Sequence, residues 1–130
     1  MSGYQVQQSV TAFDAVTLTD DYADNQYVLP CGVAEKLSID IDYAQGASET
    51  GNICHLTLEH STDGTNWYSL VIDETNTVSD ITAREWNITG DAALNIILDV
   101  AYKNIRVSIK ESGVGSNAGT ATVVLTTSGR

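Results

Sequence analysis

Strict alternation of apolar and polar side chains is the feature that most constrains how this chain can fold. In residues 37–43, Leu-Ser-Ile-Asp-Ile-Asp-Tyr, every second side chain is apolar, and residues 54–59 and 105–110 repeat the pattern. Successive side chains of a β-strand point to opposite faces of a sheet, so this period of two predicts strands with one buried and one solvated face. The chain is therefore expected to form sheets that pack on one another.

Turn clusters divide the chain into about eight short strands. The clearest turn is Asp63-Gly64, because Gly accepts a positive φ and Asp hydrogen-bonds its own backbone, which together favour a hairpin. Residues 92–100 have an alternative interpretation as a short helical turn, since Asp91-Ala92-Ala93-Leu94 has helix propensity. The segments predicted as strands are residues 12–18, 26–29, 37–43, 54–59, 67–73, 78–88, 95–100, 105–110 and 120–127.

A chain of 130 residues is long enough for one domain with a real core. We therefore predict an all-β fold, an antiparallel β-sandwich of jelly-roll or immunoglobulin-like type, with the connectivity left open. Residues 13–130 are assigned to this single domain. Residues 1–12 carry Gln and Ser without periodicity and are interpreted as an extended N-terminal arm that orders against a neighbour.

The charge is one-sided, with 17 acidic and 6 basic residues and a net charge of −11. Such a surface repels phosphate backbones and anionic lipids, so neither direct nucleic-acid binding nor membrane docking is expected. The sequence also has no signal-peptide pattern and no apolar run long enough to span a bilayer, which favours synthesis in a cytoplasm without export. Cys31 and Cys54 could form a bridge, but Cys54 falls on a predicted apolar strand face, which favours two buried thiols.

No residue pattern predicts a catalytic site, a cofactor site or a metal site. His55 and His60 are five positions apart and are expected on opposite strand faces, so they cannot share a metal without a bulge. Asp40 and Asp42 share one face, where they could hold a hard cation or act as an acid/base pair; a solvated sheet face explains them equally. Acidic residues also cluster at positions 20, 21 and 24. We expect the protein not to be an enzyme.

Three aromatic residues are candidates for the core or for an interface, namely Trp67, Tyr68 and Trp86. Neighbours on a strand face opposite ways, so one of Trp67 and Tyr68 is expected inside and the other outside. The first interpretation places Trp67 in the core. The alternative is an exposed aromatic that stacks on a sugar ring or fills a pocket of a partner.

The segment Ser-Thr-Asp-Gly-Thr-Asn-Trp-Tyr at residues 61–68 resembles a hairpin of small β-sandwich structural proteins of tailed-phage virions, including head decoration proteins. Residues 102–107 and 119–123 are similar to the way such domains end. Carbohydrate-binding sandwiches use comparable hairpins. The resemblance implies a scaffold and a virion setting, and it transfers no catalytic residue.

The leading hypothesis is therefore a virion structural protein, most simply a capsid decoration (cement) protein that is made in the host cytoplasm. Its partners would be the major capsid protein or other virion proteins, and it would form a homo-oligomer. The alternatives are a carbohydrate-binding or adhesin module and a neck or tail component of the virion.

Overall fold

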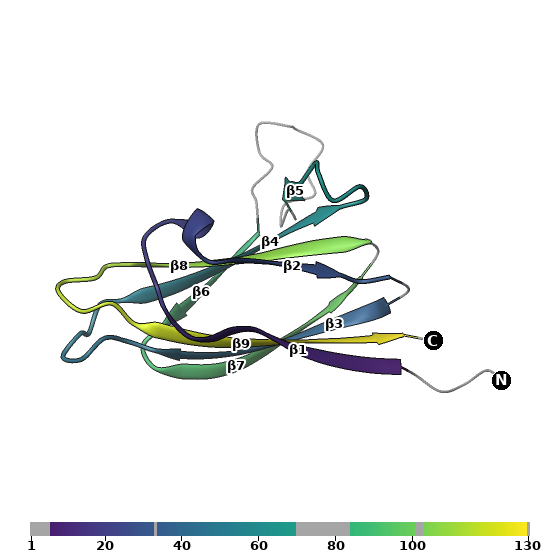
Figure 1. Ribbon diagram of the computed structural model, residues 1–130. Helices are drawn as coiled ribbons and strands as arrows, with labels where there is room; N and C mark the ends of the chain where they lie inside the picture. Colours follow the sequence, from purple (N-terminus) through teal and green to yellow (C-terminus); the bar gives the residue numbers. More distant parts are fainter. Residues whose placement is uncertain (1–5, 33, 70–83, 101–102, 130) are drawn as a thin grey trace, which may run out of the picture.

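The computed structural model describes residues 6–32, 34–69, 84–100 and 103–129, and it is a sandwich of two antiparallel sheets (Figure 1). Sheet A has the order β1-β9-β3-β7. Sheet B has the order β2-β8-β4, with β5 and β6 both pairing with β4. The elements are β1 (Val6–Thr17), the 3-10 turn η1 (Tyr22–Asp24), β2 (Gln26–Pro30), β3 (Ala34–Ala44), β4 (Ile53–Ser61), β5 (Tyr68–Ser69), β6 (Glu85–Thr89), β7 (Ala92–Asp99), β8 (Asn104–Ser112) and β9 (Thr120–Gly129).

The strand order identifies the sandwich as a jelly roll. β1, β3, β7 and β9 lie in sheet A, while β2, β4, β6 and β8 lie in sheet B, so the chain changes sheet at nearly every connection. In an immunoglobulin-like sandwich the first two strands would be neighbours in one sheet. Here they lie in different sheets, and the first strand pairs instead with the last, as in a double-sheet jelly roll.

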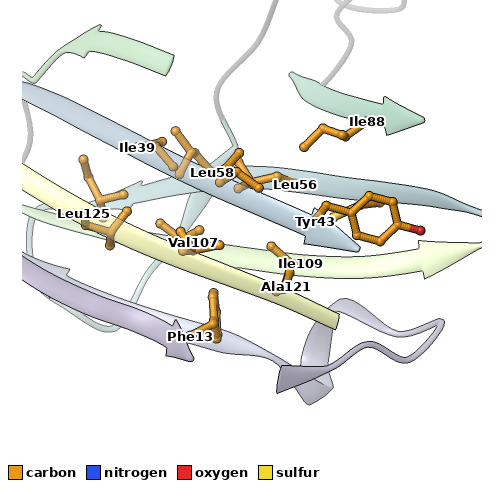
Figure 2. Close-up of a cluster of buried hydrophobic side chains, with 14 of the residues drawn as sticks. Phe13, Ile39, Tyr43, Leu56, Leu58, Ile88, Val107, Ile109, Ala121 and Leu125 are labelled. Atoms are coloured by element: carbon orange, nitrogen blue, oxygen red, sulfur yellow. The ribbon is translucent and has the colours of Figure 1, made fainter. Parts of the chain in front are cut away.

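The core lies between the two sheets, and the alternating segments supply it as predicted (Figure 2). Along β3, Leu37, Ile39 and Ile41 are buried, while the residues between them face away from the core. Burying one such side chain contributes about 1.5–3 kcal/mol. Most of the remaining core comes from the inward faces of β4, β8 and β9: Cys54, Leu56, Leu58, Ile105, Val107, Ile109, Ala121, Val123 and Leu125.

The hairpin predicted at Asp63-Gly64 is present between β4 and β5. Gly64 has a φ of +77°, which a residue with a side chain rarely adopts. The Asp63 carboxylate accepts the backbone N–H groups of Asn66 and Thr65, each at 2.8 Å, and these hydrogen bonds hold the pKa of Asp63 well below its usual range. The turn chemistry read from the sequence therefore accounts for this loop.

The connections β1–β2, β3–β4, β6–β7 and β8–β9 meet at one end of the sandwich, which we call the loop end (Figure 1). Glu49 accepts the backbone N–H groups of Gly115 at 2.6 Å and Ser116 at 3.2 Å, which joins the β3–β4 loop to the β8–β9 loop. Gly46 allows the same two loops to touch, because a Cβ there would lie 2.1 Å from the carbonyl oxygen of Asn117. The loops of this end thus form one hydrogen-bonded unit.

A buried carboxylate, Glu111, lies beneath the loop end and is 1% exposed. It accepts hydrogen bonds from the Tyr43 hydroxyl at 2.5 Å, the Gly119 N–H at 2.7 Å and the Asn52 Nδ2 at 3.3 Å. Burial, and then the hydrogen bond to Glu111, raise the pKa of Tyr43 well above its ordinary value, so the phenol remains a donor. Buried charge is tolerated here because several donors solvate it.

The strand predicted at 95–100 is confirmed and begins earlier, as β7, while the alternative of a helical turn at 92–100 is excluded. Residues 92–99 pair with β3 along their whole length, and Ile96 and Leu98 pack against the core. The N-terminal prediction needs correction. Residues 6–12, expected as part of an N-terminal arm, belong to β1 and pair with β9. Their periodicity is weak because β1 is an edge strand with two register shifts. Residues 1–5 lie outside the described residues.

The strand predicted at 67–73 is described only at its start, as β5, and the strand predicted at 78–88 only at its end, within β6. Residues 70–83 lie outside the described part of the chain. Within the described part, no helix is long and apolar enough to cross a membrane.

Candidate interaction surface

Among the described residues, aromatic rings and cations come together on the outer face of sheet B, the side that points away from the core. Alternation along β4 and β8 places Leu56 and Val107 inward and sends the residues between them outward. The outward set includes every second residue of each strand. On the described part of this face it includes Gln26, Val28, His55, Thr57, Glu59, Glu85, Asn87, Arg106, Ser108 and Lys110.

Trp67 lies on this outer face, held by a charged pair. The Arg106 guanidinium carbon is 4.7 Å from the centre of the Trp67 ring. The same guanidinium donates from Nε at 2.9 Å and from Nη2 at 2.8 Å to one oxygen of Glu59. Both charged side chains are largely shielded from solvent, so the pair is stiffer than an exposed one. The Trp67 ring therefore packs against the guanidinium in a cation–π contact.

The expectation that Trp67 anchors the core is wrong. Trp67 is half-buried and lies outside the cluster of core side chains. Tyr68 stands opposite His60 in the β4–β5 pair, their rings 5.9 Å apart, and it is 59% exposed. His60 lies two residues after Leu58 and is on the same, inward side of the sheet, so Tyr68 opposite it is on the inward side as well. Trp67 therefore points to the other side, as expected. Neither ring belongs to the cluster of core side chains.

Trp86 lies on β6 opposite Leu56, on the inward side of sheet B. It is partly buried and packs against the core, and the Arg84 guanidinium carbon is 4.8 Å from the centre of its ring. Trp86 is thus a core-edge residue. Trp67 and Trp86 lie on opposite faces of the same sheet, so they do not form one aromatic platform.

A hollow of about 400 Å³ lies on the outer face of sheet B, bordered by η1 and β5. The Tyr22 hydroxyl donates to Glu85, and the Lys110 ammonium is 4.5 Å from the centre of the Tyr22 ring. Burial first, and then the hydrogen bond to Glu85, raise the pKa of Tyr22 above its ordinary value. The hollow is lined by Tyr22, Gln26, Thr57, Glu59, Ser69, Arg84, Glu85 and Ser108.

The histidines lie on opposite faces, as predicted. His55 is on the outer face, where its ring nitrogens lie 2.5 Å from Asn87 Oδ1 and 2.6 Å from Ser112 Oγ. A carboxylate oxygen of Glu85 lies 3.4 Å from His55 Nδ1, the ring nitrogen that also contacts Asn87. Within the described residues, no group of three or more His, Cys, Asp or Glu side chains is placed to hold a metal.

The acidic residues singled out from the sequence are solvated or cap turns. Asp40 and Asp42 share the outer face of sheet A, as predicted, and both are exposed; Asn95 Nδ2 donates to Asp40 at 2.6 Å. Asp21 caps η1 through the Ala23 N–H at 2.9 Å. Asp24 accepts the hydroxyl of Thr19 at 2.7 Å. These contacts account for both clusters structurally.

Cys31 and Cys54 are both buried as free thiols. Burial, and then the charge of Glu111, raise the pKa of Cys54 to about 12, and burial raises the pKa of Cys31 as well. The interpretation of two buried thiols is therefore confirmed.

Solved structures share this fold at low sequence identity. No family model matches the sequence, and no curated protein matches it. The chain is similar to VP2 in the subviral particle of infectious bursal disease virus, with a TM-score of 0.55 and 15% identity over 95% of this chain and 32% of that one. A chain of the T13 particle of the same virus gives a TM-score of 0.53 and 14% identity over 97% and 31%. What they share is the fold alone.

This chain spans about a third of the length of those two virus proteins. A pilus protein of Bacillus endospore appendages aligns with 95% of this chain and 86% of its own, at 11% identity, but its TM-score of 0.46 is too low to support an argument. The all-β sandwich predicted from the sequence is thus confirmed, with jelly-roll domains of virus capsids among its structural neighbours.

Sequence reasoning missed the partners of Trp67 and the buried carboxylate. Arg106 and Glu59 both occupy polar positions in strands with regular alternation. This pattern predicts that they face outward, but it does not predict that they contact Trp67. Glu111 lies at an inward phase of β8, two residues after Ile109. A carboxylate at an inward-facing strand position is the one sequence signal that could have indicated the buried hydrogen bonds around Glu111.

Proposed function

We propose that this chain is a virion structural protein, and specifically a capsid decoration protein that stabilises a phage head through protein–protein contacts. The observation that carries the proposal is the contact of Trp67 with the Arg106 guanidinium, which is paired with Glu59, next to the exposed ring of Tyr68. Aromatic rings and Arg are the residues that most often dominate binding energy at protein interfaces. A ring already held in one rotamer loses less entropy on binding.

The fold is compatible with this role. A jelly roll presents two broad sheet faces and needs no ligand to complete its core. The capsid protein VP2 shares this architecture, which supports the choice of a virion setting for the proposal without identifying a partner. A decoration protein binds the assembled shell and not its free subunits, so it stabilises the shell by mass action.

The carbohydrate-binding alternative has less support. It calls for aromatic rings that converge with Asp and Asn on one face, whereas Trp67 and Trp86 lie on opposite faces of sheet B. The hollow beside Tyr22 is polar, but the Lys110 ammonium occupies one face of the Tyr22 ring. A glycan array with the purified chain tests this alternative directly, and we expect no saturable binding.

Co-sedimentation with assembled phage heads from the virus that encodes the chain tests the proposal. We expect saturable binding of the full chain and a higher temperature of shell disruption when it is bound. Trp67→Ala and Tyr68→Ala should each weaken binding about tenfold or more. The matched control is Val114→Ala, which removes an exposed apolar side chain at the loop end and should bind like the wild type.

Two results would overturn the decoration role. One is failure of the wild-type chain to bind intact heads under conditions in which it remains folded. The other is detection of the chain by mass spectrometry in purified tails but not in purified heads, which would assign it to the neck or tail instead.

A further inference from the structure

Strand β7 forms an unprotected edge of sheet A. It pairs with β3 over the whole register from Lys36 opposite Asp99 to Tyr43 opposite Ala92, without a shift, and pairs with no other strand of the described chain. Sheet edges normally carry charges, prolines, bulges or short strands that prevent pairing with another chain. From residue 92 to residue 98, the sequence Ala-Ala-Leu-Asn-Ile-Ile-Leu contains none of these features.

The other edges in the described chain are protected. β1 has two register shifts, and Ala15 has a φ of +48°, which twists this edge. β2 has 5 residues and ends at Pro30, which lacks an N–H. β6 has 5 residues, so it offers no long ladder. β7 therefore differs from the other described edges in being long, regular and uncharged from residue 92 to residue 98.

Both sides of β7 also expose apolar surface. Ile97, on the outer side, is 66% exposed, and Leu94, on the core-facing side opposite the buried Ile41, is 48% exposed. These are two of the most exposed large apolar side chains in the described structure, and they are three residues apart on one strand. A chain with a net charge of −11 thus leaves its free edge without a charge over seven positions.

We propose that β7 pairs with β7 of a second copy of this chain, antiparallel across a twofold axis, so that sheet A continues from one copy into the other. In an antiparallel pair, two residues that lie opposite each other point to the same face of the sheet. Because alternate residues of β7 point to opposite faces, two opposed β7 residues must both be even-numbered or both be odd-numbered. Placing Ile96 opposite Ile96 brings Leu94 opposite Leu98 on the core-facing side. It brings Ile97 opposite Asn95 on the outer side.

Charge is compatible with this register and disfavours the register centred on the neighbouring Asn95. With Ile96 on the axis, Asp99 faces Ala93, and each Asp99 keeps the ion pair with its own Lys36. Moving the axis to Asn95 would instead place Asp99 opposite Asp91, and opposed like charges destabilise a strand pair. Two copies of a strongly acidic chain can approach along this segment because the carboxylates at its ends are either ion-paired or hydrogen-bonded. The pairing is self-complementary, as a twofold interface must be.

Sedimentation equilibrium of the full chain over a concentration series tests the proposal. We expect a reversible dimer, and Leu94→Lys and Ile97→Lys should each weaken it about tenfold or more, because each places a new charge on both sides of the axis. The control is Val28→Lys, which adds the same charge at an exposed apolar position of sheet B and should dimerise like the wild type.

Hydrogen exchange on the wild-type chain gives a second measurement that needs no variant. Backbone amides of β7 that point to the free edge should be protected at high concentration and lose protection on dilution, while amides of β8 should not change. A wild-type chain that is monomeric at about 100 µM would overturn the proposal, as would a dimer that neither lysine variant weakens. The pairing does not depend on the decoration role, since it is measured without heads.

Discussion

Replacing Glu111 by alanine tests whether one buried carboxylate holds the loop end together. Glu111 accepts hydrogen bonds from the Tyr43 hydroxyl, the Gly119 N–H and the Asn52 side chain. The Asn52 Nδ2 keeps a second acceptor, the carbonyl oxygen of Asn117 at 3.2 Å. The substitution therefore leaves two donors in the interior, on Tyr43 and Gly119, without an acceptor.

An unsatisfied buried donor costs about 1–3 kcal/mol, so two of them cost about 2–6 kcal/mol. The lost side chain adds a small cavity. We expect Glu111→Ala to lower the free energy of unfolding by about 3–5 kcal/mol, a large share of the roughly 5–15 kcal/mol of a typical domain. Urea titration followed by tryptophan fluorescence measures this as a lower midpoint at unchanged slope.

The matched control is Glu49→Ala, at the same end of the molecule. Glu49 also accepts backbone N–H groups, but those of Gly115 and Ser116 belong to exposed residues, where water can replace the carboxylate. We expect this variant to lose less than about 1 kcal/mol. The reasoning is refuted if Glu111→Ala stays within about 1 kcal/mol of the wild type, or if Glu49→Ala is equally destabilising.

Burial and the low pKa of Asp63 lead to three more expected results. Leu58→Ala should destabilise by about 2–5 kcal/mol in urea titration and the exposed Val28→Ala by less than about 0.5 kcal/mol, so similar losses would contradict the assigned core. Backbone hydrogen bonds lower the folded-state pKa of Asp63, so its stabilisation is complete above its ordinary pKa of about 3.9 and fades as the pH falls further. The stability difference between wild type and Asp63→Ala should therefore shrink between about pH 5 and pH 2, and a constant difference would argue against the turn contacts. Finally, Cys31 and Cys54 should be almost unreactive toward a thiol reagent in the native protein and fully reactive in guanidinium; rapid labelling of the native protein would contradict their burial.

Much of the fold could be predicted because its central strands bury one face and expose the other. In β3, β4 and β8 the alternation identified Leu37, Leu56 and Val107 as core residues, and each is fully buried. Prediction weakened at the sheet edges. β1 is bulged and solvated, so its first half resembled a free arm, and the β7 residues pair with β3 on one side only, so helix propensity competed with the strand pattern.

The strand order and the interaction surface could not be predicted, because both depend on residues far apart in the chain. Trp67 meets Arg106 and Glu59 only because β8 and β5 flank β4 on its two sides. The alternation of a single strand shows which way a side chain points but not what lies over it. For Trp67 that difference decided between a core residue and a surface residue.

The two proposed surfaces can operate together, because they belong to different sheets. Pairing through β7 extends sheet A and leaves the outer face of sheet B open on each copy. On that face Arg106 and Lys110 offset the charges of Glu59 and Glu85, whereas the outer face of sheet A holds Asp40 and Asp42, so the face with Trp67 is the less anionic one. A dimer would present this face twice, and its second contact with a repeating shell would form at a high effective concentration. Ile97→Lys should therefore weaken binding to intact heads while leaving the single-site affinity for an isolated capsid fragment unchanged, which distinguishes lost avidity from a damaged binding face.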